Sequence, residues 1–208
     1  MTQEELRIKR ELKKAIEKDF LKPLSKKYGY KIIGGTPYCV HDGWLYTLFV
    51  SNTHDHIRMK IDVKPIALDE AFWEVFEMKE EAHKKPFSFH VNAAFVPYGF
   101  RLEEWKIPIA AVEEAESVLE QAFAGANEKI AGYCGQLQTI EDFKALVQGH
   151  EPVNHLNIIL CDIVSGDLES ALARTEEELS HKHSGGFASV KGGDIYEYVR
   201  RYCRERLI

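Results

Sequence analysis

The sequence lacks paired cysteines: its four cysteines lie far apart, at positions 39, 134, 161 and 203. No Cys-x-x-Cys pair occurs, so no zinc-finger or thiol–disulfide motif is present. The residues after Met1 are polar and charged, without the apolar core of a secretory signal. No apolar run approaches the roughly 20 residues that a membrane-spanning helix needs. We therefore expect a cytoplasmic protein with reduced, mostly buried thiols and no membrane segment.

Signatures of catalysis and of nucleotide binding are missing as well. There is no Gly-x-Ser-x-Gly, no His-Glu-x-x-His and no Gly-x-Gly-x-x-Gly after a strand. The glycine-rich stretch 184–193 precedes a helix, but it lacks the Gly-Lys-Ser/Thr ending of a phosphate loop. Asp194 would also place a carboxylate where an anion should bind. We interpret this stretch as a flexible loop and expect no cofactor.

The net charge of −6 is unevenly distributed along the chain. Residues 1–31 contain ten Lys/Arg and five acids, which leaves a charge of −11 on the remainder. A basic segment could meet an anionic partner, but lysine-rich helix faces are common, and we interpret this one as a solvated face. A sequence pI near 5.9 argues against nucleic-acid binding.

A helix is predicted over residues 3–28. Apolar residues recur there at every fourth position, at Leu12, Ile16, Phe20 and Leu24. Thr2 can cap the first turn, with Glu5 as its capping-box partner. Pro23 removes one hydrogen bond of the helix and should kink or split it. Gly29 provides a stop.

Residues 29–65 read as an antiparallel meander around which the rest of the chain is organised. Gly34-Gly35 and Asp42-Gly43 are turn signals between runs rich in β-branched and aromatic residues. Residues 56–63 alternate strictly between apolar and polar, which predicts one buried face and one wet face. The predicted strands are Tyr30–Ile33, Thr36–His41, Trp44–Ser51 and His56–Val63.

The remaining elements are mostly helical. We predict a helix at Leu68–Lys79, a strand at Phe87–Val96, and a loop at 98–109 with an edge strand near 104–108. Residues from 110 onward have helical patterns. The apolar run 157–164 fits a helix or a strand, and its helical neighbours favour a helix. The prediction is an α+β fold: a sheet domain at 1–109 and a helical region at 110–208 packed on it as one globular unit.

Residues 21–51 resemble a family of small bacterial α+β domains of unknown function. The similarity is carried by Leu21-Lys22-Pro23-Leu24, by Gly29-Tyr30-Lys31 and by Gly35-Thr36-Pro37-Tyr38. It covers the end of the first helix and the first strands of the meander. The resemblance implies a helix-plus-meander fold, and it transfers no catalytic residue.

Cysteine and histidine pairs on the meander suggest a metal site. His54 and His56 have the i,i+2 spacing that places two side chains on one face of a strand, and so have Cys39 and His41. Together they could form a Cys/His₃ site across neighbouring strands. The competing interpretation is a wet loop with two solvated imidazoles and a buried thiol.

A small-molecule pocket could form in the aromatic stretch from Phe87 to Trp105. Its candidate lining residues combine aromatic rings, an imidazole, an amide and a carboxylate, and they are His90, Asn92, Tyr98, Glu103 and Trp105. The competing interpretation is that these aromatic side chains only cover the core.

The leading functional hypothesis is a non-enzymatic protein that binds another macromolecule, of the immunity or regulatory type found in bacteria. Its support is the missing catalytic signature together with the polarised charge, and its partner is expected to be another protein. The alternative is an enzyme or small-ligand-binding domain that uses the Phe87–Trp105 region.

Overall fold

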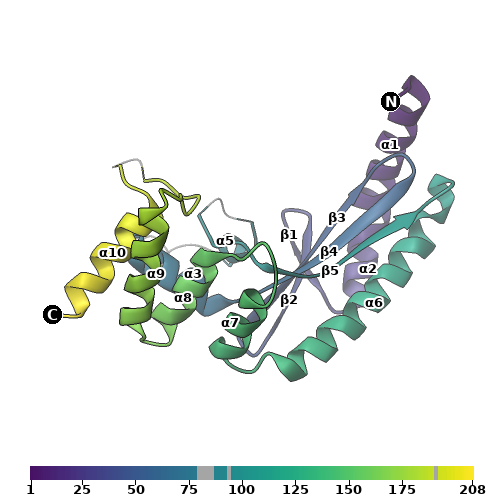
Figure 1. Cartoon of the computed structure of the whole chain (residues 1–208). Coiled ribbons are helices and arrows are strands. Elements are labelled where there is room, and N and C mark those ends of the chain that lie inside the picture. Colours follow the sequence, from purple (N-terminus) through teal and green to yellow (C-terminus); the bar gives the residue numbers. More distant parts are fainter. Residues whose placement is uncertain (79–86, 93–94, 190–191) are drawn as a thin grey trace. The chain divides into compact units, whose positions relative to one another are not determined.

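The computed structural model of the chain describes residues 1–78, 87–92, 95–189 and 192–208. They form an α+β fold with a five-stranded antiparallel sheet, an N-terminal helix and a helical C-terminal half, as predicted (Figure 1). The chain divides into two compact units, the first of residues 1–63 and 99–136 and the second of 64–98 and 137–208. The division therefore does not follow the predicted boundary at residue 109.

The first unit holds the sheet and the long helices at both ends of its sequence. Its elements are α1 (Gln3–Ala15), the π-helix η1 (Ile16–Phe20), α2 (Leu21–Lys27), β1 (Lys31–Ile33), β2 (Thr36–His41), β3 (Trp44–Asn52), β4 (His56–Pro65, to Val63 in this unit), β5 (Phe100–Pro108), the 3₁₀-helix η2 (Val112–Glu114) and α6 (Ala115–Gln136).

The N-terminal helix has the cap, the interruption and the stop that its sequence predicts. Thr2 and Glu5 form a capping box. Ahead of Pro23 the helix widens into η1, and the Leu21 N–H donates to the Ile16 carbonyl five residues back. The proline therefore splits the helix into α1 and α2, because it lacks the N–H that a regular ladder needs. Gly29, with φ +81°, follows the end of α2.

The sheet is a meander in the order β1-β2-β3-β4-β5, although residues 66–99 separate β4 from β5 in the sequence. Two-residue turns join the first strands: Gly34 and Gly35 have φ 55° and 81°, and Asp42 and Gly43 have φ 48° and 84°. Positive φ at both positions is the type I′ turn, whose twist matches that of a hairpin. β5 begins at Phe100, earlier than the predicted edge strand.

One face of the sheet is buried under α6. Ile57, Met59, Ile61 and Val63 on β4 are fully buried, which confirms the predicted alternation. β4 pairs with β5 in the register Met59↔Trp105 and Ile61↔Glu103. The Glu103 carboxylate accepts from Lys129 of α6 at 3.0 Å, so α6 lies over this face.

The second unit is helical. Its elements are α3 (Ile66–Val75), α5 (Ser88–Asn92), α7 (Ile140–Gln148), α8 (His155–Val164), α9 (Leu168–Ser180) and α10 (Ile195–Arg206). The helix favoured for 157–164 is confirmed as α8. Its residues Leu156–Ile163 are all buried, the polar Asn157 and Asp162 included, so the sequence shows a mostly apolar run instead of an amphipathic period.

The strand predicted at Phe87–Val96 is wrong for the part that the structure describes. Residues 88–92 form the short helix α5, and residues 93–94 lie outside the described residues. The alternating apolar residues share no buried face, since Val91 is buried while Phe87 is 37% exposed. Tertiary contacts of the His90 side chain outweigh the local strand pattern.

Ion pairs neutralise the arginine-rich helix α10 within its own unit. Arg204 pairs with Glu176 at 2.6 Å, and Arg206 pairs with Glu74 at 3.4 Å. Arg206 also lies 3.7 Å from the ring centroid of Tyr202. No helix in the described part of the chain has the length and apolar character that crossing a bilayer requires.

The left-handed conformation of Gly29 can be tested by substitution. Gly29→Ala should lower the free energy of unfolding by about 1 kcal/mol, because a Cβ disfavours positive φ. Gly132 of α6 is the control: it has no positive φ, and an added Cβ would meet nothing within 4 Å. Gly132→Ala should raise the free energy of unfolding by about 0.5–1 kcal/mol. Chemical denaturation measures the free energy of unfolding of both variants. Equal effects of the two substitutions would contradict the left-handed conformation of Gly29.

Candidate functional site

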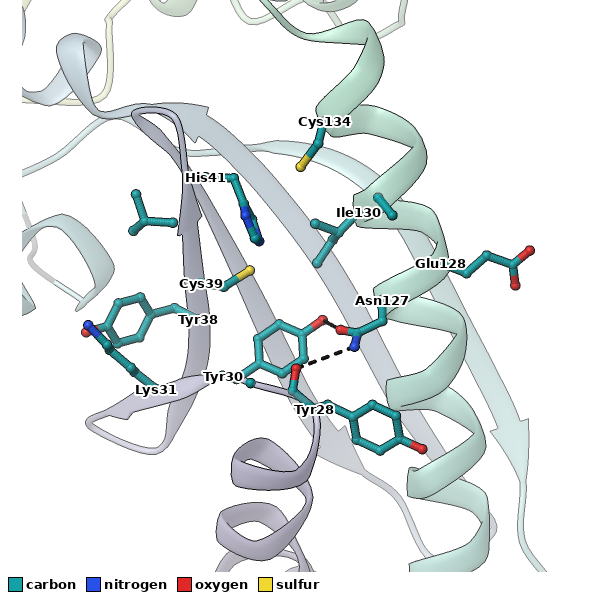
Figure 2. Close-up of a pocket in the computed structure, with 13 residues that line it drawn as sticks. Tyr28, Tyr30, Lys31, Tyr38, Cys39, His41, Asn127, Glu128, Ile130 and Cys134 are labelled. Carbon is teal, nitrogen blue, oxygen red and sulfur yellow. Dashed lines mark hydrogen bonds between the residues drawn. The ribbon is translucent and has the colours of Figure 1, made fainter.

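A cavity of about 860 Å³ lies within the first unit, between the sheet and α6 (Figure 2). Three segments line it: the chain that enters β1, the second half of β2, and the C-terminal half of α6. The lining residues are Tyr28, Gly29, Tyr30, Lys31, Tyr38, Cys39, Val40, His41, Asn127, Glu128, Ile130, Ala131 and Cys134. This volume lies within the range of about 300–1,000 Å³ that is typical of ligand pockets.

The cavity borders an open sheet edge, because β1 is short. At the C-terminal end of α2, the Tyr30 N–H donates to the Ser25 carbonyl at 2.8 Å, and the Gly29 N–H donates to the Lys26 carbonyl at 3.3 Å. These two bonds form a Schellman motif, which ends the helix and uses the Gly29 N–H that would face Val40 in a longer β1. β1 therefore starts only at Lys31, which pairs with Tyr38.

The second half of β2 has a strand neighbour on one side only. The β1–β2 ladder ends at the Lys31↔Tyr38 pair, and no other described strand continues it alongside residues 39–41. On the other side, Cys39 pairs with Tyr46, and His41 with Trp44. The edge beside the cavity is thus unpaired over three residues.

The two turns identify the backbone groups at this open edge. The pair that flanks a two-residue type I′ turn exchanges both hydrogen bonds, and bonded pairs then alternate along an antiparallel ladder. His41↔Trp44 flanks one turn, so Cys39 and His41 bond to β3. Val40 then directs its N–H and C=O towards the open edge. The Gly34-Gly35 turn gives the same result, because it makes Lys31↔Tyr38 the last bonded pair.

The floor of the cavity is uncharged. Cys39 and Cys134 point into it from β2 and from α6 (Figure 2). Burial raises the pKa of Cys39 to about 12, so its thiol stays protonated. The Cys134 thiol donates to the Tyr46 hydroxyl at 3.6 Å, and burial is also the main reason that the pKa of Tyr46 is raised. A protonated, buried thiol is a weak nucleophile.

A hydrogen bond joins the start of β1 to α6 beside the cavity. The Tyr30 hydroxyl donates to the Asn127 Oδ1 atom at 2.5 Å, and the Asn127 amide donates to the Tyr28 carbonyl at 3.4 Å (Figure 2). Burial raises the pKa of Tyr30, which keeps this donor protonated. The charged ends of Lys31 and Glu128 point away from the cavity.

The four predicted metal ligands are not brought together. Cys39 and His41 lie at the β2–β3 end of the meander, whereas His54 and His56 lie at the β3–β4 end. The nine residues of β3 separate the two ends by about 30 Å at ~3.3 Å per residue. Among the described residues, no group of three or more His, Cys, Asp or Glu side chains could hold a metal ion.

The predicted His54 and His56 pair has local partners instead. His54 Nε2 lies 3.8 Å from Glu5 of α1, and His56 Nδ1 lies 2.7 Å from Asp55. Hydrogen bonds from Thr53 and His56 are the main reason that the pKa of Asp55 falls to about 2. These contacts fix the β3–β4 turn. The alternative interpretation expected two solvated imidazoles, but the His56 side chain is only 12% exposed.

The five residues of the predicted small-molecule pocket are divided between the two units. His90, Asn92 and Tyr98 belong to the second unit, while Glu103 and Trp105 lie on β5 in the first. Glu103 is used in the ion pair with α6 described above. Neither unit therefore holds the complete set.

His90 belongs to a buried network in the second unit. Its Nδ1 atom lies 2.8 Å from the Asp69 carboxylate, which is fully buried. Lys64, also buried, donates to the same carboxylate at 2.7 Å. Burial lowers the pKa of Lys64, and the Asp69 charge acts in the opposite direction. The centroid of the His90 ring lies 4.9 Å from that of Trp73 and 5.0 Å from that of Phe87.

The sequence interpretation missed the part of the site that α6 supplies. Asn127, Ile130 and Cys134 follow one another at helical spacings of three and four residues and face the cavity together. The signal was present in the sequence as an apolar stripe at helical spacing along α6, which includes the buried residues Ala122, Ala126 and Ile130. The sheet face that this stripe covers could not be deduced from the period alone.

Comparison of the chain with protein-family models, with curated proteins and with solved structures finds no match. The resemblance of residues 21–51 to a family of small bacterial domains stays a prediction. The function is therefore argued from the geometry of the groove between β2 and α6, which we call the edge groove. It comprises the cavity and the open edge at Cys39–His41.

The Tyr30–Asn127 hydrogen bond should stabilise the edge groove. Tyr30→Phe removes the donor and should lower the free energy of unfolding by about 1 kcal/mol. Tyr28→Phe is the matched control, because no partner of the Tyr28 hydroxyl is found among the described residues, and it should change stability by less than about 0.5 kcal/mol. Denaturant unfolding of both variants measures the difference. A Tyr30→Phe variant as stable as the Tyr28→Phe variant would contradict this role.

The Asp69 carboxylate should be essential for folding of the second unit. Asp69→Asn leaves Lys64 buried without its counter-ion, which should cost about 3 kcal/mol or more in the free energy of unfolding. Glu70→Gln, at the exposed neighbouring position, provides the control and should be nearly neutral. Thermal unfolding followed by circular dichroism compares the two variants. A wild-type melting temperature for Asp69→Asn would show that the network contributes little.

Proposed function

We propose that the chain is a non-enzymatic protein that binds another protein, and that the edge groove holds an extended segment of that partner. The observation that carries the proposal is the open edge of β2 at Val40. An unpaired N–H and C=O on a sheet edge is the pattern with which an extended polypeptide pairs. A small molecule without a peptide-like donor and acceptor would leave both groups to water.

The arrangement of a strand edge beside a helix supports the proposal. A segment added next to β2 would place alternate side chains over the sheet face, where the cavity lies between β2 and α6. Main-chain bonds would supply affinity, and the cavity would supply specificity. Val40 is 41% exposed, so its side chain also offers apolar contact at this edge.

The chemistry of the cavity favours binding over catalysis. Cys39 is protonated at neutral pH, because its pKa is raised to about 12, so it is poorly suited to nucleophilic attack. The nearby hydroxyls of Tyr30 and Tyr46 have raised pKa values for the same reason, burial. These groups contribute hydrogen bonds and shape to a binding surface.

The proposal includes a cytoplasmic location and a role of the immunity or regulatory type. All four cysteines are free, and Cys161 and Cys203 are buried, which suits a reducing compartment. A small protein that captures a segment of a partner could inhibit or regulate that partner.

The second candidate is an enzyme or small-ligand-binding domain with its site in the Phe87–Trp105 region. One observation favours it: Asp69 orients the His90 imidazole through Nδ1, as in many acid–base sites, which leaves Nε2 for a ligand. Binding of a fragment library, followed by NMR at His90, would test this candidate.

A peptide-display selection tests the leading proposal. The full-length chain should select heptapeptides from a random library, and their dissociation constants can be measured by fluorescence anisotropy. Val40→Pro removes the N–H at the open edge without taking a bond from β3. The loss of one main-chain hydrogen bond should weaken peptide binding about tenfold, or by ~1.4 kcal/mol.

Val40→Thr is the matched control, since threonine keeps the N–H and the β-branched shape. It should bind the selected peptides within about twofold of the parent chain, as expected of a substitution that leaves every main-chain bond in place. Failure to select any peptide would contradict the proposal. Equal binding by the parent and by Val40→Pro would contradict the placement of the site.

A further inference from the structure

We infer that the segment held in the edge groove carries an acidic residue between two apolar residues, with the acid opposite Val40. This inference rests on the proposed function and names the chemistry of the partner. It follows from the side-chain directions of β2, from the uncharged walls of the cavity and from the position of Lys31.

Side chains of an added strand point to the same faces as the residues they pair with. Cys39 and His41 point into the cavity, so the segment residues next to them would also point inwards (Figure 2). Val40 lies between them and points to the opposite face. The residue opposite Val40 would therefore point away from α6, while its two neighbours enter the cavity. The rule holds for parallel and for antiparallel addition, because the pattern is symmetric about its central residue.

The two inward positions should be uncharged and apolar. The walls that they meet include the protonated Cys39 thiol, the Ile130 side chain and the Cys134 thiol. The polar groups beside them, Tyr30 and Asn127, already bond to one another. A carboxylate or ammonium that entered beside the Cys39 thiol would lose hydration without meeting an opposite charge, which is strongly unfavourable. The His41 imidazole lines the exposed end of the cavity, so the position beside Cys39 is the more restrictive of the two.

The central position should be acidic because of Lys31. Lys31 pairs with Tyr38, and both side chains point to the face opposite the cavity (Figure 2). Val40 follows Tyr38 by two residues on β2, so the residue opposite Val40 would lie about 7 Å along the same face from Lys31. A lysine side chain can span that distance to a carboxylate. Lys31 is exposed and has no ion-pair partner in the part of the chain that the structure describes.

Synthetic nonapeptides test this pattern on the full-length chain. Each has a central triplet between Ser/Thr flanks, and the triplets are Val-Glu-Val, Val-Lys-Val and Asp-Glu-Asp. Dissociation constants are measured by NMR titration at low ionic strength. The Val-Glu-Val peptide should bind about fivefold more tightly than Val-Lys-Val, an effect of the size expected for an exposed ion pair. It should bind more than about tenfold more tightly than Asp-Glu-Asp, which forces charge into the cavity.

Reversing the charge of the protein separates a specific pair from a general charge effect. Lys31→Glu should exchange the preference, so that Val-Lys-Val becomes the tighter ligand. Lys14→Glu makes the same change in net charge on the exposed face of α1 and should leave the preference unaltered. Raising the salt concentration should reduce the preference of the parent chain for Val-Glu-Val and the preference of Lys31→Glu for Val-Lys-Val.

The outcomes distinguish the inference from the function on which it rests. Peptides that bind with equal affinity for all three triplets would overturn the inference and leave strand addition standing. A preference for Val-Glu-Val that persists in Lys31→Glu would overturn the role of Lys31. If no peptide of the series binds, the proposed function fails, and the inference fails with it.

Discussion

The Schellman motif at the end of α2 is the constraint on which the site depends. Gly29 adopts a positive φ, and the next N–H, of Tyr30, returns to the Ser25 carbonyl at 2.8 Å. The Gly29 N–H, which would face Val40 in a longer β1, bonds instead to the Lys26 carbonyl, and β1 has only three residues. β2 continues for three residues beyond the last pair with β1, and this difference in length creates the open edge. The cavity beside it exists because α6 covers the sheet face without filling the corner next to β2.

The local features of the fold were readable from the sequence because each depends on a few neighbouring residues. The capping box of Thr2, the break ahead of Pro23 and the stop at Gly29 follow from backbone chemistry alone. The Asp42-Gly43 turn and the alternation along β4 likewise predicted strands and their buried face. These features account for the order of the meander, and they account for half of the site, the segment from Gly29 to His41.

The other half of the site depends on contacts between distant residues, which local patterns do not specify. Asn127 reaches the cavity only because α6 returns across the sheet, and its partner Tyr30 lies 97 residues earlier in the sequence. The predicted strand at Phe87–Val96 failed for a similar reason, since Asp69 holds His90 in α5. The metal prediction is not supported by the geometry, because the two i,i+2 pairs lie at opposite ends of β3, whose nine residues separate them.

Amide hydrogen exchange at the open edge tests the central claim, which is that the backbone of Val40 faces an unpaired sheet edge. In the free protein, the Val40 N–H should exchange with solvent rapidly, while the N–H groups of Cys39 and His41 should be protected by their bonds to β3. This pattern of one fast amide between two slow ones is specific to an open edge. A Val40 amide as well protected as Cys39 and His41 would show that the edge is already covered and would contradict the account.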